Sequence, residues 1–217
     1  MRASVPADGL LFNRVAGESR DQLDQFWTPP PLAAIITAWL SRQIDPPRTI
    51  LEPSVGGGAL ARAARATWPG ARVVGVDLDP AAAGFRDVDL PIVGDWLSVP
   101  EIEADLVLGN PPFSGVVAIP HVTRALRAAP AVALVLPWAP LGGIEEWHDV
   151  LVARPPAVVA PIVPRPWPRH VRETALYVWV RGRNGRTEIA HLPRWRRQDG
   201  SSAATRKRNA VAASASA

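Results

Sequence analysis

Short apolar runs rich in β-branched residues alternate with Ala-rich stretches of helical periodicity along most of the chain. This alternation is typical of an α/β protein in which helices wrap a mostly parallel sheet. The pattern predicts seven strands, at residues 49–54, 72–77, 91–95, 105–110, 131–137, 157–163 and 174–180. It also predicts helices at about residues 31–43, 57–67, 79–86, 119–129 and 145–153, so the expected fold is a doubly wound, Rossmann-like sheet.

The length of 217 residues suits a single domain with a substantial core. We expect an extension at residues 1–20, one domain at 21–197 and a tail at 198–217. The tail has small, polar and basic residues without periodicity, which is typical of disorder. No apolar run approaches the roughly 20 residues of a membrane helix, and the first residues do not resemble a secretory signal. The sequence therefore predicts a cytoplasmic protein with no membrane partner.

Two residue types restrict the chemistry. The chain has no cysteine, which excludes disulfides, thiolate metal sites and a cysteine nucleophile. Its four histidines, His121, His148, His170 and His191, show no ligand spacing. The sequence therefore predicts that no metal ion is bound.

Charge is distributed unevenly along the chain. Residues 1–164 carry 12 arginines and 17 acidic residues, a net charge of −5, whereas residues 165–217 carry a net charge of +9. Such a gradient indicates that the C-terminal part meets a polyanion, and nucleic acid is the commonest one. The alternative is a solvated, Arg-rich surface that reflects compositional bias.

A glycine turn follows the first expected strand. Gly56, Gly57 and Gly58 lead into an Ala-rich helix, and glycines there let the backbone pass close to a ligand. Asp77 ends the next strand, 21 residues after Gly56, where a carboxylate can accept both hydroxyls of a ribose. Gly56, Gly58 and Ala61 also match a dinucleotide fingerprint, so an NAD-dependent enzyme is a second interpretation. A plain tight turn is the third.

Asp95 and Trp96 follow the third expected strand, in "VGDWL". The carboxylate of Asp95 is placed to accept a hydrogen bond from an adenine amino group, and the Trp96 ring to cover the base. A solvated carboxylate at a strand end is the alternative for both Asp77 and Asp95.

The fourth expected strand runs directly into Asn110, Pro111, Pro112 and Phe113. The two prolines make a rigid turn that presents the Asn110 amide oxygen and the Pro111 carbonyl as acceptors. Two acceptors suit one NH₂ group, and Phe113 offers a face on which a planar base can stack. A turn that simply ends the strand is the alternative.

A Pro-rich segment between the last two expected strands combines positive charge with an aromatic surface. Arg165, Trp167, Arg169 and His170 lie in "PRPWPRH", and such residues suit phosphate and base contacts. The alternative is an ordinary loop whose tryptophan packs on the core.

Five segments together resemble a known family. "LEPSVGGG", "VVGVDLDP", "GDWL" and "NPPF", preceded by "DQFWTPPPLAAIITAWL" within residues 21–40, resemble class I S-adenosylmethionine-dependent methyltransferases of the N6-adenine DNA group. The resemblance spans about residues 21–180, and "RPWP" followed by "ALYVWV" looks like the end of compact phage and restriction-modification members. It implies a seven-stranded, mostly parallel sheet whose last strand is antiparallel.

The resemblance also implies roles for individual residues. It implies S-adenosyl-L-methionine as the cofactor, DNA as the partner, and direct in-line transfer of the methyl group. The cofactor-binding residues would be Trp27, Thr28, Pro29, Glu52, Pro53, Gly56, Gly58, Asp77, Asp95 and Trp96. The catalytic residues would be Asn110, Pro111, Pro112 and Phe113, and the nucleic-acid contacts would be Arg165, Trp167, Arg169 and His170.

The chain departs from the family pattern in two places. Trp27 stands where a tyrosine is usual, and there is no separate target-recognition domain of normal size. Four alternatives stay open from the residues alone: a methyltransferase of an RNA base, a methyltransferase of a protein glutamine, an NAD-dependent oxidoreductase, and a non-catalytic nucleic-acid-binding module. The cytoplasm expected for this protein would be bacterial, or that of the host if a phage encodes it.

Overall fold

One mixed sheet forms the centre of the computed structural model, which describes residues 26–113, 115–138, 145–167, 173–183 and 185–196. The sheet has eight strands in the order β3-β2-β1-β4-β5-β7-β6-β8. The strands are β1 (Thr49–Glu52), β2 (Arg72–Asp77), β3 (Leu90–Val93), β4 (Leu106–Gly109), β5 (Ala131–Pro137), β6 (Val158–Pro161), β7 (Thr174–Val180) and β8 (Glu188–Ile189). All seven expected strands are therefore present.

Strand direction follows the expected doubly wound pattern. Strands β1 to β5 are parallel to one another, and β7 is antiparallel to both β5 and β6. The strand order reverses between β1 and β4, which is where ligands bind in open α/β sheets, outside the carboxyl ends of the strands. The expected mostly parallel sheet is confirmed, and β7 is antiparallel as expected, but it is not the last strand because the short β8 follows it.

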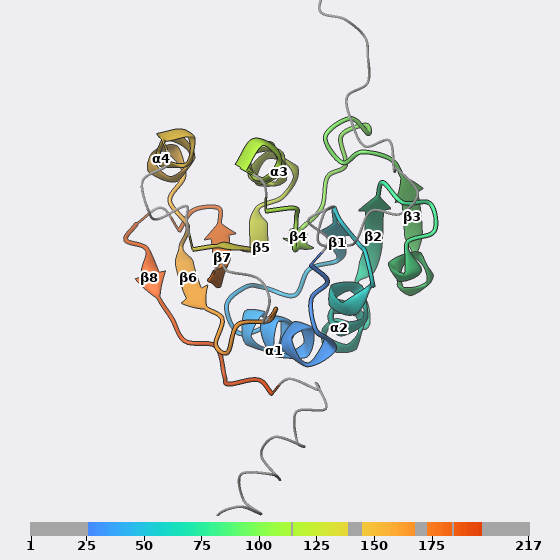
Figure 1. Cartoon of the computed structure of the whole chain (residues 1–217), viewed down its shortest axis with the longest axis horizontal. Helices are drawn as coiled ribbons and strands as arrows, with labels where there is room; N and C mark the ends of the chain where they lie inside the picture. Colours follow the sequence, from blue (N-terminus) through green and yellow to red (C-terminus); the bar gives the residue numbers. More distant parts are fainter. Residues whose placement is uncertain (1–25, 114, 139–144, 168–172, 184, 197–217) are drawn as a thin grey trace, which may run out of the picture.

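Helices cover both faces of the sheet (Figure 1). Helices α1 (Pro30–Leu40) and α2 (Ala59–Thr67) lie on one face, and α3 (Gly115–Ala128) and α4 (Glu145–Ala153) lie on the other. Each face has its own buried cluster, one around Leu40 and Leu60 and one around Val122 and Trp147. Prolines occupy the first turn of α1, where a missing N–H costs no helical hydrogen bond.

Two elements differ from expectation. The prediction of a helix at 79–86 is wrong, because only a short 3-10 helix, η1 (Ala83–Asp87), forms there. Asp77 and Asp79 accept hydrogen bonds from backbone N–H groups two residues further on, so their side chains hold this stretch in turns. The sequence pattern also missed β8, whose two residues pair with Val158 and Val159 of β6.

Parts of the expected domain organisation lie outside the described residues. These are the extension at 1–20, the start of the domain at 21–25, and the tail at 198–217, so these boundaries stay predictions. Among the described residues, no helix is both long enough and apolar enough to cross a membrane. The described residues also contain no group of three or more His, Cys, Asp or Glu side chains that could hold a metal ion.

Candidate active site

Three neighbouring parallel strands end on polar residues at one edge of the sheet. Glu52 ends β1, Asp77 ends β2, and Asn110 directly follows β4. Because β2, β1 and β4 are adjacent and parallel, these residues lie at the same edge. Pro53 contributes to this closeness, since an added Cβ at Gly109 would lie 3.1 Å from the Cδ atom of Pro53.

Asp77 holds the glycine turn in place. Its Oδ2 atom accepts a hydrogen bond of 2.7 Å from the N–H of Gly56, and its Oδ1 atom accepts one of 2.9 Å from the N–H of Asp79. A carboxylate has about four acceptor positions, so two remain for a ligand hydroxyl. The structure therefore gives Asp77 a structural role that is compatible with the expected contact to a ribose.

The glycines of the turn have separate tasks. Gly56 and Gly58 have φ angles of +46° and +72°, in the left-handed region that favours glycine. Gly58 also contacts η1 closely, because an added Cβ would lie 2.6 Å from the Cα atom of Gly84. Gly58 is thus required by packing within the protein, whereas Gly56 and Gly57 lie under the indole ring of Trp27.

Trp27 covers the glycine turn. An added Cβ would lie 3.2 Å from this indole at Gly56 and 3.1 Å from it at Gly57. The Trp27 side chain is nevertheless 43% exposed. The ring that the sequence placed near the cofactor therefore lies next to the turn, with one side open to solvent.

Two buried oxygen atoms near the turn have no hydrogen-bond partner among the described residues. They are Oε2 of Glu52 and Oγ1 of Thr28, in side chains that are 3% and 7% exposed. Burial raises the pKa of the Glu52 carboxyl well above its usual range, and the nearby charge of Asp77 acts in the same direction. A buried carboxylate with an unused oxygen suits a cationic ligand, and S-adenosylmethionine carries an ammonium and a sulfonium group. The residues present therefore fit this cofactor.

Asp95 and Trp96, the two expected cofactor residues after β3, differ in how deeply they are buried. Asp95 is half-buried, and its carboxylate accepts hydrogen bonds from the N–H of Leu97 and the hydroxyl of Ser98. Trp96 is 2% exposed and packs in the core cluster of α3, with the Arg124 guanidinium 4.5 Å from the centre of its ring. The Trp96 ring therefore lies in the core on the α3 side, and its expected contact with an adenine stays a prediction.

Asn110 is fixed by one hydrogen bond and has one unused oxygen. Its Nδ2 atom donates to the backbone carbonyl of Phe26 at 2.6 Å. Its Oδ1 atom is buried and has no partner among the described residues. The Phe26 carbonyl therefore sets the orientation of the amide and leaves the acceptor oxygen available, which is what capture of an NH₂ group requires.

Phe113 belongs to an aromatic cluster with Phe26 and Trp167. The Phe113 ring is stacked on Phe26 at a centroid distance of 6.1 Å and meets Trp167 edge-to-face at 5.5 Å. Phe113 is only 3% exposed, so a target base can reach its face only if Phe26 or Trp167 moves. The indole N–H of Trp167 donates to the carbonyl of Trp27 at 2.9 Å, which joins this cluster to the segment over the glycine turn.

Part of the loop between β6 and β7 lies at the candidate active site. Trp167 is in the aromatic cluster, and Arg165 is exposed and 3.4 Å from the carboxylate of Glu173. Arg169 and His170, which were expected to contact nucleic acid, lie outside the described residues.

Three expected site residues are prolines. Pro111 is buried, Pro112 is half-buried, and the Pro29 carbonyl accepts the first hydrogen bond of α1 from Ala33.

Phe26 is the functional residue that the sequence analysis missed. It contacts the site through its ring and its carbonyl, on Phe113 and Asn110 respectively. The only signal was its position next to Trp27 in "FWTPP". A backbone carbonyl carries no residue-type signal, so the contact with Asn110 could be found only from the structure.

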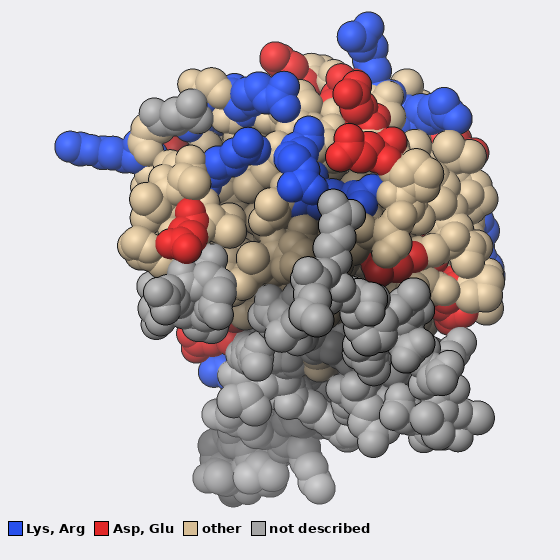
Figure 2. Space-filling model, turned by 90° about the horizontal axis from the view of Figure 1, so that it is seen from above, with Lys and Arg blue, Asp and Glu red and all other residues tan. Residues whose placement is uncertain are grey.

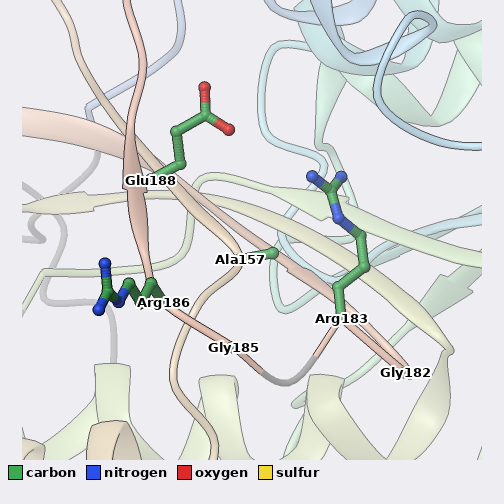
Figure 3. A pocket seen from close by; sticks show the side chains of 6 residues that line it. All are labelled: Ala157, Gly182, Arg183, Gly185, Arg186 and Glu188. Atoms are coloured by element: carbon green, nitrogen blue, oxygen red, sulfur yellow. The ribbon is translucent and has the colours of Figure 1, made fainter.

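A pocket lies at the other end of the sheet, at the turn between β7 and β8. Its volume is about 350 Å³, and it is lined by Ala157, Gly182, Arg183, Gly185, Arg186 and Glu188 (Figure 3). Val180, at the end of β7, pairs with Ala131 at the start of β5. The pocket is therefore far from the carboxyl ends of the parallel strands and does not belong to the candidate active site.

Comparison with solved structures shows a class I methyltransferase fold. A putative class I S-adenosylmethionine-dependent methyltransferase from Listeria monocytogenes has a TM-score of 0.65 at 14% identity, covering 79% of this chain and 67% of that one. The methyltransferase subunit of a type I restriction-modification system from Streptococcus thermophilus has a TM-score of 0.63 at 17% identity, covering 76% and 47%. The expected class I methyltransferase fold is confirmed.

Sequence comparison finds a relative named as a Type II methyltransferase, and no family model matches the chain. The relative is the Type II methyltransferase M.XamI from Xanthomonas campestris pv. amaranthicola, 32% identical over 117 residues. The match covers 48% of this chain and 22% of the relative. It thus spans about a fifth of the relative's length.

Proposed function

We propose that this protein transfers a methyl group from S-adenosylmethionine to the exocyclic N6 amino group of adenine in DNA. The observation that carries the proposal is the Asn110 amide, whose nitrogen is held by the Phe26 carbonyl while its buried oxygen has no partner among the described residues. A buried acceptor without a partner is unfavourable by about 1–3 kcal/mol, so its retention favours a role in binding a donor.

The reaction needs alignment more than acid–base chemistry. The bound cofactor supplies an electrophilic methyl group on a positively charged sulfur. The Asn110 oxygen and the Pro111 carbonyl accept the two hydrogens of the target amine, which directs its lone pair toward that methyl group and stabilises the positive charge on nitrogen. Glu52 and Asp77 orient the cofactor from the ends of β1 and β2.

The aromatic cluster supports a base as the target. Phe113 offers stacking worth about 1–3 kcal/mol per base, provided that Phe26 or Trp167 moves aside. An adenine in a duplex must also leave the base stack, which costs a few kcal/mol. We therefore propose that base binding displaces an aromatic ring that covers Phe113 in the free protein.

The choice of DNA rests on the relatives. M.XamI is named a Type II methyltransferase, and the Streptococcus thermophilus protein is named as part of a restriction-modification system. A methyltransferase of an RNA base or of a protein glutamine would use the same amide chemistry, so labelled-product analysis must separate them. An NAD-dependent oxidoreductase explains the glycines and Asp77 but gives no task to the buried Asn110 oxygen.

The test is the variant Asn110→Ala, assayed for both methyl transfer and cofactor binding. We expect transfer to unmethylated DNA to fall at least a hundredfold, because alignment of the amine is lost, while the dissociation constant for S-adenosylmethionine changes less than threefold. Calorimetry measures binding, and transfer of label measures activity. Unchanged transfer by the variant would contradict the role of Asn110. No transfer by the unmodified protein to any nucleic acid would favour a binding module.

A further inference from the structure

The segment after β8 returns to the loop that follows β6. Strand β8 runs parallel to β6, so the chain leaving β8 heads toward the carboxyl ends of the parallel strands. The indole N–H of Trp195 donates to the carbonyl of Pro164 at 3.0 Å. Figure 1 shows this red segment passing on the side of the sheet that carries α1. Residues 190–196 are therefore fixed beside the loop that carries Arg165 and Trp167.

This segment has an apolar side and a basic side. Trp195 is 4% exposed within the core cluster of α1 and α2, and Leu192 packs against the same cluster. Arg194 and Arg196, on either side of Trp195, are both exposed. Among the described residues, neither arginine forms a salt bridge. The buried indole thus holds two free guanidinium groups at a defined place on the surface.

We propose that Arg194 and Arg196 bind the phosphate backbone of the nucleic acid next to the target base. The inference rests on the proposed function, since it takes a nucleic acid as the substrate. The neighbouring loop supplies the connection to the site, because Trp167 contacts Phe113 and Trp195 contacts Pro164. Arginine is well suited to this task, as its planar guanidinium matches phosphate oxygens in a bidentate manner.

The rest of the basic surface is arranged differently. Arg183 and Arg186 lie at the turn between β7 and β8, at the opposite end of the sheet (Figure 3). On the face above α3 and α4, arginine side chains are interspersed with Asp and Glu at the top of the view (Figure 2). Mixed charges of this kind give a weaker field than a single-sign patch. Arg194 and Arg196 therefore differ from these other arginines in their position near the candidate active site, and not in the amount of charge that they carry.

The test compares two double variants of the full chain that remove the same charge. These are R194Q/R196Q and, as the matched control, R183Q/R186Q. Fluorescence anisotropy with a labelled, unmethylated DNA duplex measures affinity across a range of salt concentrations. At 0.1 M salt we expect R194Q/R196Q to bind about tenfold to a hundredfold more weakly, and its plot of log affinity against log salt to be shallower by about 2. The control should stay within about threefold of the unmodified protein.

The binding experiment tests the role of Arg194 and Arg196 independently of whether the protein methylates nucleic acid. Equal loss in both double variants, or no loss in R194Q/R196Q at an unchanged melting temperature, overturns it. Weaker binding by R194Q/R196Q alone supports it, even if the unmodified protein methylates no nucleic acid, in which case only the proposed function fails. Unchanged binding by R194Q/R196Q overturns the inference even where methylation proceeds.

Discussion

At the scale of single residues, the site contains polar atoms that the protein itself leaves without partners. The buried oxygens of Thr28, Glu52 and Asn110 lie on three separate segments that meet at the carboxyl edge of the sheet. Buried polar atoms in folded proteins are nearly always hydrogen-bonded. Among the described residues six buried side-chain atoms have no partner, and the other three belong to Trp96, Arg124 and Thr174. Under the proposed function the cofactor completes Glu52 and Thr28, and the target base completes Asn110.

Glu52 provides a prediction on stability and binding. Because its pKa is raised in the folded protein, the ligand-free protein loses stability as the pH rises from the ordinary carboxyl pKa toward the raised value. We expect Glu52→Gln to melt at a higher temperature than the unmodified protein at pH 8, with a difference that shrinks toward pH 5. Its affinity for S-adenosylmethionine should fall tenfold to a hundredfold, as hydrogen bonds to charged groups are worth about 1.5–3 kcal/mol.

Thermal denaturation and calorimetry over pH 5–8 measure the two effects of Glu52→Gln. Opposite changes in stability and affinity are the signature of a group kept for ligand binding. A variant that is less stable at pH 8 and binds the cofactor normally would show that Glu52 is a structural residue.

At the scale of elements, the glycine turn is held from two sides. Asp77 at the end of β2 binds the backbone of Gly56, and η1 presents Gly84 to the backbone of Gly58. The carbonyl of Gly56 also accepts a hydrogen bond of 2.8 Å from the N–H of Gly84. The turn before α2 is therefore a packed junction of β1, β2 and η1 and keeps its shape before any ligand arrives.

This junction predicts the effect of Gly58→Ala. An alanine there has an unfavourable φ angle and a Cβ 2.6 Å from a backbone atom, so we expect a loss of at least about 2 kcal/mol in the free energy of unfolding. The matched control is Gly70→Ala, where no heavy atom lies within 4 Å and the φ angle is not positive. The control should change stability by less than about 1 kcal/mol. Equal effects in urea denaturation would contradict the packing of Gly58 against η1.

Strands and helices with a clear hydrophobic period could be predicted from the sequence, and their packing partners could not. The strands at 72–77, 131–137 and 174–180 have the expected bounds because the inner residues of each strand are buried on both faces. The helix expected at 79–86 failed because local hydrogen bonds of Asp77 and Asp79 hold a turn. Strand β8 has two exposed residues, which leave no periodic signal.

The same limit applies to the candidate site. Asn110 and Asp77 could be predicted because their residue types and positions at strand ends carry the signal. Trp96 was expected at the cofactor, but its side chain enters the core on the α3 side, a choice of direction that spacing does not determine. Phe26 acts through a backbone carbonyl and through contacts made across the fold. Such contacts depend on tertiary packing, so they could be recognised only from the structure.

At the scale of the whole molecule, two half-sites face each other across the switch point between β1 and β4. The cofactor side consists of the glycine turn with Glu52 and Asp77, and the target side consists of Asn110 and the aromatic cluster. The segment of Phe26 and Trp27 touches both sides. This arrangement supports the proposal that one small cofactor binds opposite one planar target.

Ligand-induced stabilisation of the whole chain tests which cofactor belongs there. A ligand at a hundredfold excess over its dissociation constant stabilises the folded state by about 2.7 kcal/mol. For a chain of this size that corresponds to a rise of roughly 5–11 °C in melting temperature. We expect this rise with S-adenosylmethionine or its demethylated product, and no rise with NAD. Stabilisation by NAD alone would favour the oxidoreductase interpretation.

We propose above that the corner at Asn110 and Pro111 captures a planar amine opposite the cofactor. The most direct measurement incubates the protein with methyl-labelled S-adenosylmethionine and unmethylated DNA, RNA and protein in parallel, and then separates the labelled products by nucleoside and amino-acid analysis. We expect label in N6-methyladenine from DNA with the unmodified protein, and none with Asn110→Ala. Label found only on an oxygen, on a ring carbon or on a side chain without an NH₂ group would contradict it.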